Sequence, residues 1–434
     1  VTGGTFSSDV SAYIADGYEQ VDGVVSTDVT LSEDDVAMVN GQYFAVLQNA
    51  INAANAGDTV TLVNDAVESV IINNTTTLDL NGHKLVNAEQ AQNSSVASSD
   101  RKHTITVTGN GTLTVQGTGT VDNVSHGQAA IYNEINGTII LNGGTFTRSA
   151  EEGTSILGED GKWTNSANGN SWYTITNLGS MTINDGVTIS QGYQKEDGSW
   201  TGSFSSLFDS GWVKPADNTE NAAATVTING GTFLRGKASL KNDSFSTMTV
   251  NGGSFLDASN WSVNNYGNLI IHNGVFESVR SGLYNGSGSL TVNGGSFKYD
   301  SGLSGIFNAE GCELNVIGGQ YANEDVKPYL AKGYTTKKTA DGAGMWEIVI
   351  DESSDVFVAR IGNVGYETLQ TAIDSALAGN TVVILKDVEE SVVIAAEQDI
   401  TLDLNGKTLS GSNNHTVINK GTLTITDSAF SAAN

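Results

Sequence analysis

Short runs of alternating apolar and polar residues recur along the whole chain. Leu290-Thr291-Val292 and Leu423-Thr424-Ile425 are typical, with every second residue apolar and the others small or β-branched. An alternation with a period of two predicts a β-strand that buries one face. Turns of glycine and asparagine separate the runs, and no helical stretch lies between them. The pattern therefore favours stacked short strands over alternating strands and helices.

One phrase, Asn-Gly-Gly-Thr/Ser-Phe, gives the period of this pattern. It begins at Asn142, Asn229, Asn251 and Asn293, with weaker copies at Asn184, Asn273 and Ile317. From Asn229 onward the steps are 22, 22, 20 and 24 residues, and the two earlier steps are 42 and 45. The longer steps fit two turns each, or one turn with an insertion. A period of roughly 20–50 residues indicates a solenoid or a propeller.

Three short strands per period, joined by tight turns, predict a parallel β-helix. Asparagines at a fixed distance before the alternating strand would then stack as a ladder, for which we select Asn133, Asn285, Asn308 and Asn419. The Gly-Gly pair would form a corner that needs positive φ or a close backbone approach. The phenylalanine after it would point inward. A β-sandwich is the alternative, but sandwich strands do not repeat one phrase at one spacing.

A second, much longer repeat connects the two ends of the chain. Residues 1–26 resemble residues 316–342, and residues 36–82 resemble residues 358–406, with offsets of 315 to 324 residues. Thr77-Leu78-Asp79-Leu80-Asn81-Gly82, for example, recurs as residues 401–406. This organisation is typical of a segment from a tandem array. It is unusual for a free-standing enzyme.

One amphipathic segment per repeat predicts a helix. Phe44, Leu47, Ile51 and Ala54 fall on one face of a helix of about three turns, and Gly57 ends it. An open β-helix exposes core and unpaired backbone at its end. We therefore expect this helix to act as the N-terminal cap of each unit.

These patterns divide the chain into five parts. They are the tail of a preceding β-helix unit (1–26), a joint strand (27–40), a complete unit (41–330) with a cap helix (43–56), a hairpin joint (331–364), and the cap helix and first turns of the next unit (365–434). Two insertions, 147–173 and 190–222, interrupt the rhythm of the complete unit. We expect the joint to be semi-rigid and the units to follow one another along a fibre.

Composition excludes several classes of function. Lys and Arg number 20 against 48 Asp and Glu, which gives a net charge of −28. This acidity argues against nucleic acid, whose phosphates require basic side chains. A single cysteine, Cys312, excludes an internal disulfide framework. No apolar run approaches the length that spans a membrane, so we expect no membrane insertion in this segment.

The chain resembles the pectate-lyase-like right-handed β-helix superfamily. It resembles more closely the tandem repeats of very large surface proteins of gut bacteria. The resemblance rests on the Leu-Gln-x-Ala-Ile helix, Leu-Asp-Leu-Asn-Gly, the Asn-Gly-Gly-Thr/Ser-Phe phrase and the Tyr-Ile/Leu-Ala-x-Gly-Tyr ending. It covers nearly the whole chain and implies an all-β, right-handed parallel β-helix, tandemly repeated. Such surface proteins are described as adhesin-like, whereas enzymes of the superfamily cleave polysaccharides.

The sequence offers little support for catalysis. Hydrolysis of a glycoside needs two carboxylates about 5–10 Å apart. Asp79 and Asp403 stand at the same place in two copies of one motif, which favours a structural role in a turn. The basic residues Arg148, Arg235 and Arg280 are isolated in sequence. The five histidines (83, 103, 126, 272 and 415) lack the spacing of a zinc site.

The two insertions are the best candidates for a binding surface. They hold Trp163, Trp172, Trp200 and Trp212, and a shared phrase places Glu159 and Asp160, and Glu196 and Asp197, beside tryptophans 163 and 200. Each copy of the phrase predicts a hairpin tip. Exposed indoles beside carboxylates suit the stacking of sugars, and the acidic tips could instead hold Ca²⁺. The alternative is that these tryptophans pack the loops against the solenoid.

We therefore expect a non-enzymatic structural repeat of a surface fibre or adhesin stalk, extracellular on a bacterial cell. Its partners would be neighbouring units of the same fibre, and glycans or other molecules of a host surface. We expect no cofactor. The alternative is a β-helix that binds or cleaves polysaccharide, as a lyase or glycoside hydrolase, through the face near 147–222.

Overall fold

The computed structural model describes most of the chain in residues 1, 4–14, 18–21, 23–27, 31–89, 101–151, 154–157, 163–166, 172–201, 205–213, 222–299, 305–340, 342, 344–411 and 415–430. Within this part, the α-helices are α1 (Leu47–Ala53) and α2 (Leu369–Ser375), of seven residues each. No helix of the described residues is long and apolar enough to cross a bilayer. The chain forms two compact units, residues 1–290 with 295–314, and 291–294 with 315–434.

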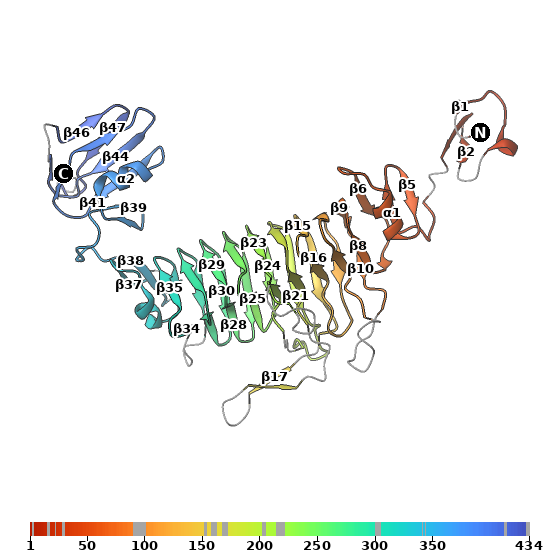
Figure 1. Ribbon diagram of the computed structural model, residues 1–434, viewed down its shortest axis with the longest axis horizontal. Helices are drawn as coiled ribbons and strands as arrows, with labels where there is room; N and C mark the ends of the chain where they lie inside the picture. Colours follow the sequence, from red (N-terminus) through yellow and green to blue (C-terminus); the bar gives the residue numbers. More distant parts are fainter. Residues whose placement is uncertain are drawn as a thin grey trace. The chain divides into compact units, whose positions relative to one another are not determined.

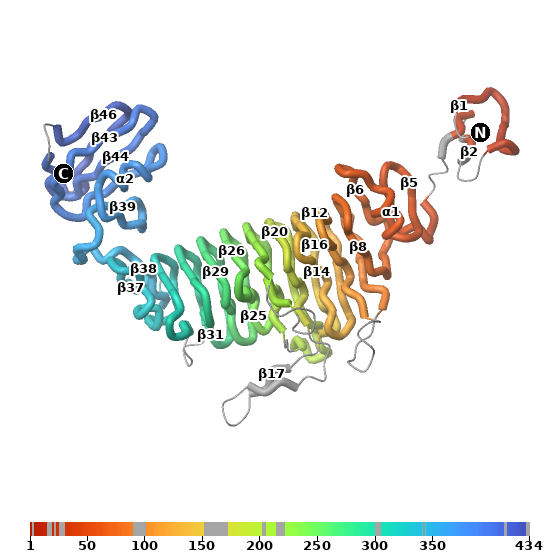
Figure 2. The backbone as a smooth tube through the Cα atoms, viewed as in Figure 1, coloured from red at the N-terminus to blue at the C-terminus, as the bar shows by residue number. Residues whose placement is uncertain are grey.

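Three parallel sheets build the first unit, and Figures 1 and 2 show their strands side by side in successive turns. The first sheet contains β6 (Thr59–Leu62), β9 (Thr75–Asp79), β12 (Thr112–Gln116), β15 (Thr138–Leu141), β20 (Ser180–Ile183), β23 (Thr225–Ile228), β26 (Thr247–Val250) and β29 (Asn268–Ile271). The next strands in this rhythm, β32 (Ser289–Val292) and β35 (Glu313–Val316), have residues in both units.

The second sheet contains β7 (Ala66–Val67), β10 (Lys84–Val86), β13 (Thr120–Asp122), β16 (Gly144–Arg148), β21 (Val187–Gln191), β24 (Thr232–Leu234), β27 (Ser254–Ala258), β30 (Val275–Ser278) and β33 (Ser296–Lys298). The third sheet contains β8 (Val70–Ile72), β11 (Ile105–Val107), β14 (Ile131–Asn133), β19 (Ile175–Asn177), β22 (Phe208–Ser210), β25 (Ala238–Asn242), β28 (Trp261–Asn265), β31 (Ser281–Asn285) and β34 (Ile306–Asn308). Each strand pairs in parallel with its equivalent one turn later. The predicted all-β parallel β-helix is confirmed, and a β-sandwich is excluded.

A column of aromatic rings fills the core behind the second sheet. The phenylalanines of the repeated phrase stand opposite one another in register, and Phe255, Phe276 and Phe297 stack with ring centroids 4.5 and 4.7 Å apart. All three are buried. Burial of each such side chain contributes about 1.5–3 kcal/mol. The prediction that this residue points inward is confirmed.

The Gly-Gly corner before each phenylalanine uses both properties of glycine. Gly253 has φ of +113°, which a residue with a side chain rarely adopts. At Gly143, a Cβ atom would lie 2.6 Å from the carbonyl oxygen of Gly117 in the previous turn. The second glycine thus turns the chain, and the first lets neighbouring turns approach.

Buried asparagines form a ladder at the C-terminal end of the third-sheet strands. Asn265 donates from Nδ2 to Oδ1 of Asn285 (2.7 Å), and Asn285 donates to Asn308 (2.7 Å). The same Nδ2 of Asn265 also donates to the backbone oxygen of Ser289. The ladder therefore connects side chains along the axis and satisfies backbone carbonyls on the way.

The ladder consists of two runs. The first joins Asn133 to Asn177 (2.7 Å), and the second begins with Asn242, which donates to Asn265 (2.8 Å). Ser210 stands between the runs: its hydroxyl accepts a long hydrogen bond from Asn177 (3.5 Å) and is bonded to the hydroxyl of Ser246 (2.7 Å). The Oδ1 atoms of Asn133 and Asn242 have no partner, because no amide precedes them. Each run thus leaves one buried acceptor unsatisfied.

Three of the four asparagines selected from the sequence lie in this column. Asn133, Asn285 and Asn308 occupy the last position of their strands. Asn419 lies in the second unit, where it stands opposite Ile394 in register and its Oδ1 accepts a bond from the Gly421 N–H.

A second asparagine ladder lies on the surface. Its members are the asparagines of the repeated phrase itself. Asn184 donates to Asn142 (2.7 Å), Asn229 to Asn184 (2.8 Å) and Asn251 to Asn229 (2.8 Å), all exposed. This ladder donates toward the N-terminus, whereas the buried ladder donates toward the C-terminus.

The first turn of the solenoid is capped by side chains of α1. The side-chain amide of Gln48 donates to the carbonyl of Ile71 (3.0 Å) and accepts from the Ile71 N–H (2.7 Å). This amide therefore bonds the edge of β8, the first strand of the third sheet. Glu68 accepts the N–H groups of Leu47 and Gln48, the first residues of the helix (2.8 and 2.9 Å). A side chain of the helix thus gives the β8 backbone the hydrogen bonds that a further turn would have given.

An antiparallel hairpin completes the cap. It consists of β4 (Ala37–Val39) and β5 (Gln42–Phe44), and β4 pairs antiparallel with β6. Two predicted boundaries are therefore wrong. The predicted helix 43–56 begins at Leu47, because Phe44 is part of β5. It ends at Ala53. The end of the predicted joint strand 27–40 belongs to the cap.

The second unit repeats this cap. Glu390 accepts the N–H groups of Leu369 and Gln370, and Gln370 bonds both backbone groups of Val393. Its strands are β36 (Gln320–Tyr321), β37 (Tyr334–Lys338), β38 (Trp346–Ile350), β39 (Ala359–Ile361), β40 (Val364–Tyr366), β41 (Asn380–Ile384), β42 (Val388–Glu389), β43 (Val392–Ile394), β44 (Asp399–Asp403), β45 (Leu409–Ser410), β46 (Val417–Asn419) and β47 (Thr422–Thr426). From β41 onward the pairs are parallel.

The N-terminal segment folds like the start of the second unit. β1 (Gly4–Thr5) and β2 (Tyr18–Val21) both pair antiparallel with β3 (Val24–Thr27), and η1 (Ser11–Tyr13) lies between β1 and β2 in sequence. In the second unit, β36 and β37 both pair antiparallel with β38, and η3 (Glu324–Tyr329) lies between β36 and β37. The long-range sequence repeat is therefore a repeat of local structure.

The buried ladder gives a first prediction. Asn285→Ala removes the acceptor of Asn265 and the donor to Asn308, so we expect a loss of about 1–3 kcal/mol in the free energy of unfolding. Urea unfolding followed by circular dichroism measures it. Asn251→Ala, in the exposed ladder, is the matched control and should cost no more than about 0.5 kcal/mol. Equal effects of the two substitutions would contradict a stabilising role of the buried ladder.

Candidate functional site

The first predicted loop contains a hairpin. β17 (Thr154–Leu157) pairs antiparallel with β18 (Trp163–Ser166), so the tip falls between them as predicted. Glu159 and Asp160 lie outside the described residues, and so does the side chain of Trp163. Their candidate role in binding stays a prediction.

The second predicted loop also folds back on itself. Gln194 and Trp200 form an antiparallel bridge around a tight turn in which the Lys195 N–H donates to the Ser199 carbonyl. Glu196 and Asp197 are exposed on this turn. Asp197 accepts both the N–H and the hydroxyl of Ser199, and these bonds lower the pKa of its carboxyl. The carboxylate of Asp197 therefore stabilises the turn.

Trp200 is the exposed indole of this loop. It is 43% exposed, and the guanidinium carbon of Arg235 lies 3.5 Å from its ring centroid. One face of the ring is therefore covered by a cation, which is an attractive contact. Arg235 stands in no recognised sequence motif, and the fold brings it against Trp200, 35 residues earlier in the chain.

Trp172 and Trp212 pack together instead of forming open platforms. With Tyr173 they make a cluster in which ring centroids are 5.5 to 5.9 Å apart, in tilted and edge-on arrangements. All three are half-buried. For these two tryptophans, the alternative of packing against the solenoid is the better description.

Beneath this aromatic cluster lies the most unusual group of charges, which we call the lysine triad: Asp209, Lys241 and Asp243. Asp209 and Lys241 stand opposite each other in register on β22 and β25. The Lys241 ammonium donates to Oδ1 of Asp209 (2.8 Å) and to Asp243. Its nitrogen lies 5.2 Å from the ring centroid of Tyr173 and 5.8 Å from that of Trp212.

The lysine triad is nearly sealed from water. The side chains of Asp209, Lys241 and Asp243 are 0%, 15% and 10% exposed. Burial raises the pKa of Asp209 well above its ordinary value, and neighbouring Asp243 raises it further, although contact with Lys241 opposes this. For Lys241, burial disfavours the charge, but Asp209, Tyr173 and Asp243 outweigh it and raise the pKa. The group thus retains protons tightly.

Several buried polar atoms on this side of the third sheet have no hydrogen-bond partner. Oδ2 of Asp209 is one of them. Thr176 Oγ1 and Asn264 Oδ1, at the same register position on β19 and β28, are others. Buried polar atoms without partners are uncommon and indicate a bound water, a reactive group or a strained site. Sequence reasoning missed this column because its members share no motif.

A second buried ion pair lies at the end of β16. Arg148 and Glu151 form a salt bridge with both side chains fully buried. The guanidinium also donates to the carbonyls of Gln128 (2.8 Å) and Ser125 (2.7 Å). Burial lowers the pKa of Arg148, and Glu151 opposes this. Arg148 therefore has a structural role: it pairs with Glu151 and bonds backbone carbonyls more than 15 residues earlier in the chain.

The motif carboxylates have structural contacts. Asp79 accepts the N–H of Asn81 and the side-chain amide of Gln116. Asp403 accepts the N–H groups of Asn405 and Ser428. Burial raises the pKa of Asp403, but together the bonds from Ser428 and Asn405 outweigh it, and the pKa is lowered. Each carboxylate thus holds the turn that follows it and also contacts the next coil of the solenoid, and the two residues lie in different units.

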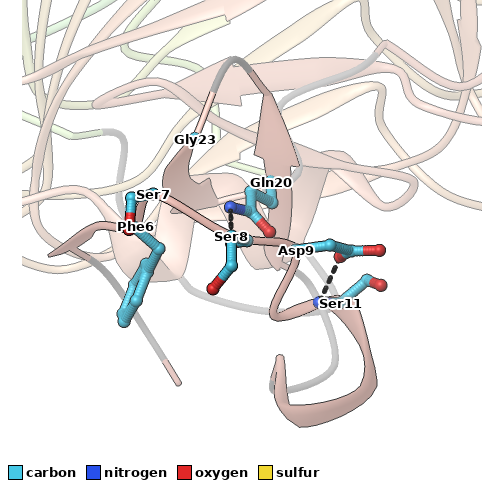
Figure 3. Close-up of a pocket in the computed structure, with 7 residues that line it drawn as sticks. All are labelled: Phe6, Ser7, Ser8, Asp9, Ser11, Gln20 and Gly23. Atoms are coloured by element: carbon cyan, nitrogen blue, oxygen red, sulfur yellow. Dashed lines mark hydrogen bonds between the residues drawn. The ribbon is translucent and has the colours of Figure 1, made fainter.

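Figure 3 shows a surface pocket in the N-terminal segment, lined by Phe6, Ser7, Ser8, Asp9, Ser11, Gln20 and Gly23. Gln20 donates to the Ser8 carbonyl and accepts the Val10 N–H, while Asp9 accepts the Ser11 N–H. These polar groups hold the local turns. In the described part of the chain, no three His, Cys, Asp or Glu side chains are grouped to hold a metal ion.

A scan against protein-family models and searches of the curated proteins and of the solved structures find no match for this chain.

The buried ion pair gives a second prediction. Glu151→Gln leaves Arg148 charged and buried without its counter-ion, so we expect a loss of about 3–5 kcal/mol in the free energy of unfolding. Thermal unfolding measures it. The double variant Arg148→Met with Glu151→Met removes both charges. It should lose less free energy of unfolding than the sum of the losses in Arg148→Met and in Glu151→Met measured separately. Additive costs would contradict the coupling.

Proposed function

We propose that this chain is a structural segment of an extracellular bacterial surface fibre or adhesin stalk, built from tandem β-helix units. The observation that carries the proposal is the repeated cap. Glu68 and Gln48 make the same four contacts to backbone N–H and C=O groups in the first unit as Glu390 and Gln370 make in the second. A chain that begins an equivalent solenoid twice is organised as a repeat.

The packing of the predicted hairpin joint supports the same proposal. β37 and β38 form the predicted hairpin, and Asn363 bonds the N–H of Ile350 and the carbonyl of Ile348. The ring of Phe357 packs edge-on against Tyr334 at 5.3 Å. At Gly365 a Cβ atom would lie 2.3 Å from that ring, so only glycine fits there. These contacts favour a semi-rigid joint, and the end-to-end arrangement of units stays a prediction.

The proposed location gives a third prediction. An antibody raised against this chain should label intact cells of the bacterium that carries the gene, without permeabilisation. Brief treatment of the cells with a protease that cannot enter them should remove the label, while an antibody to a cytoplasmic enzyme of the same cells stays negative. Label that appears only after permeabilisation would contradict an extracellular fibre.

A second candidate function is the binding of polysaccharide through the face near residues 147–222. The observation that favours it is Trp200, an indole that is partly exposed and supported by Arg235. A sugar ring stacked on an indole gives weak binding, and many units on one fibre would add avidity.

This candidate gives a fourth prediction. If the loop binds sugars, the intact chain gives a signal on a glycan array, and Trp200→Ala with Trp163→Ala reduces it at least about tenfold. Trp346→Ala is the matched control, because this half-buried indole lies outside the insertions. A signal indifferent to the first pair, or no signal, would leave the plain structural function.

A further inference from the structure

The lysine triad has the geometry of a pair of reacting groups. The Lys241 nitrogen lies 2.8 Å from Oδ1 of Asp209, so it is within reach of the carbon of that carboxyl group. Parallel pairing of β22 with β25 in register fixes the two side chains on the same face of adjacent turns. The contact is therefore set by the fold and does not depend on a flexible loop.

The surroundings of the triad disfavour a simple ion pair. Both side chains are nearly sealed, and burial of charged groups costs several kcal/mol per ion, a cost that conversion to a neutral amide would remove. Oδ2 of Asp209 accepts no hydrogen bond from a donor group, whereas a side-chain hydrogen bond between Asp209 and Asp243 requires a proton on one of the two carboxyl groups. Tyr173 and Trp212 provide aromatic walls around the lysine nitrogen. Water is thus largely excluded from the contact.

We propose that Lys241 and Asp209 condense into an intramolecular amide bond that joins two adjacent turns of the solenoid, with Asp243 as the proton carrier. Asp243 is in place for this role, because it also accepts a hydrogen bond from the Lys241 ammonium. The cross-link would replace two buried charges by a neutral amide.

Each atom of the reaction is accounted for. The ammonium group first gives one proton to Asp243, and the free amine attacks Cγ of the protonated Asp209 carboxyl group to form the C–N bond. The nitrogen then passes its second proton to one carboxyl oxygen, the C–O bond breaks, and this oxygen leaves as water. The nitrogen keeps its third proton as the amide N–H. The raised pKa of Asp209 favours the protonated acid that the attack requires. The raised pKa of Lys241 opposes loss of the ammonium proton, so this proton must pass directly to Asp243 through the hydrogen bond between them.

The cross-link would be a modification site within the wall of the solenoid. It would join β25 covalently to β22, a solenoid strand that lies inside the predicted insertion 190–222 and ends at Ser210, between the two runs of the buried asparagine ladder. The inference stands on the triad itself and does not depend on the proposed fibre.

Intact-mass spectrometry of the denatured full chain tests the proposal. We expect a mass lower than the sequence mass by one water molecule. Trypsin should then leave residues 196–235 joined to residues 238–280, because the modified Lys241 is no longer a cleavage site. A chain at its full sequence mass would overturn the proposal, and so would a bond between any other pair of residues.

Three substitutions refine the test. Lys241→Arg keeps the positive charge but not the nucleophile, so the variant should have its full sequence mass. Asp243→Asn keeps both reacting groups and should slow formation about 10²–10⁴-fold, the usual contribution of a proton carrier. Lys237→Arg makes the same exchange at a half-buried lysine outside the triad and should keep the loss of water. A loss of water that persists in Lys241→Arg would overturn the assignment.

Discussion

Every turn of this solenoid must pack against the turn before it and pair with its hydrogen-bonding groups. Parallel strands in register place each side chain on its equivalent one turn away, so a column must be chemically compatible with itself. A phenylalanine column meets this condition by stacking, and an asparagine column meets it because one amide both donates and accepts. The two asparagine ladders run in opposite directions along the chain, one buried and one exposed.

The same constraint governs where the columns stop. A ladder that ends inside the molecule leaves an unpaired group, as at Oδ1 of Asn133 and of Asn242. A sheet that ends exposes the unpaired N–H and C=O groups of its last strand. In the cap, the side-chain amide of Gln48 bonds one N–H and one C=O of this edge, as a neighbouring backbone would. A second copy of this solution at Gln370 shows that the chain starts a solenoid twice by the same means.

The regular columns could be predicted from the sequence, because their residues recur at nearly one spacing. The inward phenylalanines and the general position of the cap were found in this way. The members Asn177, Asn242 and Asn265 of the buried ladder were missed, although each lies 7 to 9 residues before a copy of the repeated phrase, as Asn133 and Asn285 do. The predicted helix was too long, because the aromatic residues before it continue an apolar pattern although they form a strand.

The charged contacts could not be predicted for a different physical reason. Asp209 and Lys241 are 32 residues apart, and only the register of two strands brings them together. Arg148 and Glu151 are neighbours in sequence, but their full burial depends on packing by residues from other turns, such as the carbonyls of Ser125 and Gln128. The periodicity of the sequence predicts whether a side chain points into the core or outward. It does not predict which residues from other turns contact that side chain.

Hydrogen exchange of the asparagine side-chain amides tests the central claim most directly. With asparagine labelled by ¹⁵N, the Nδ2 protons of Asn265 and Asn285 can be compared with those of Asn229 and Asn251 in the exposed ladder. If register stacking holds the solenoid, the buried amides exchange only as slowly as the core backbone opens, and the exposed amides exchange far faster. Equally fast exchange in both ladders would show that the buried column does not hold the turns together.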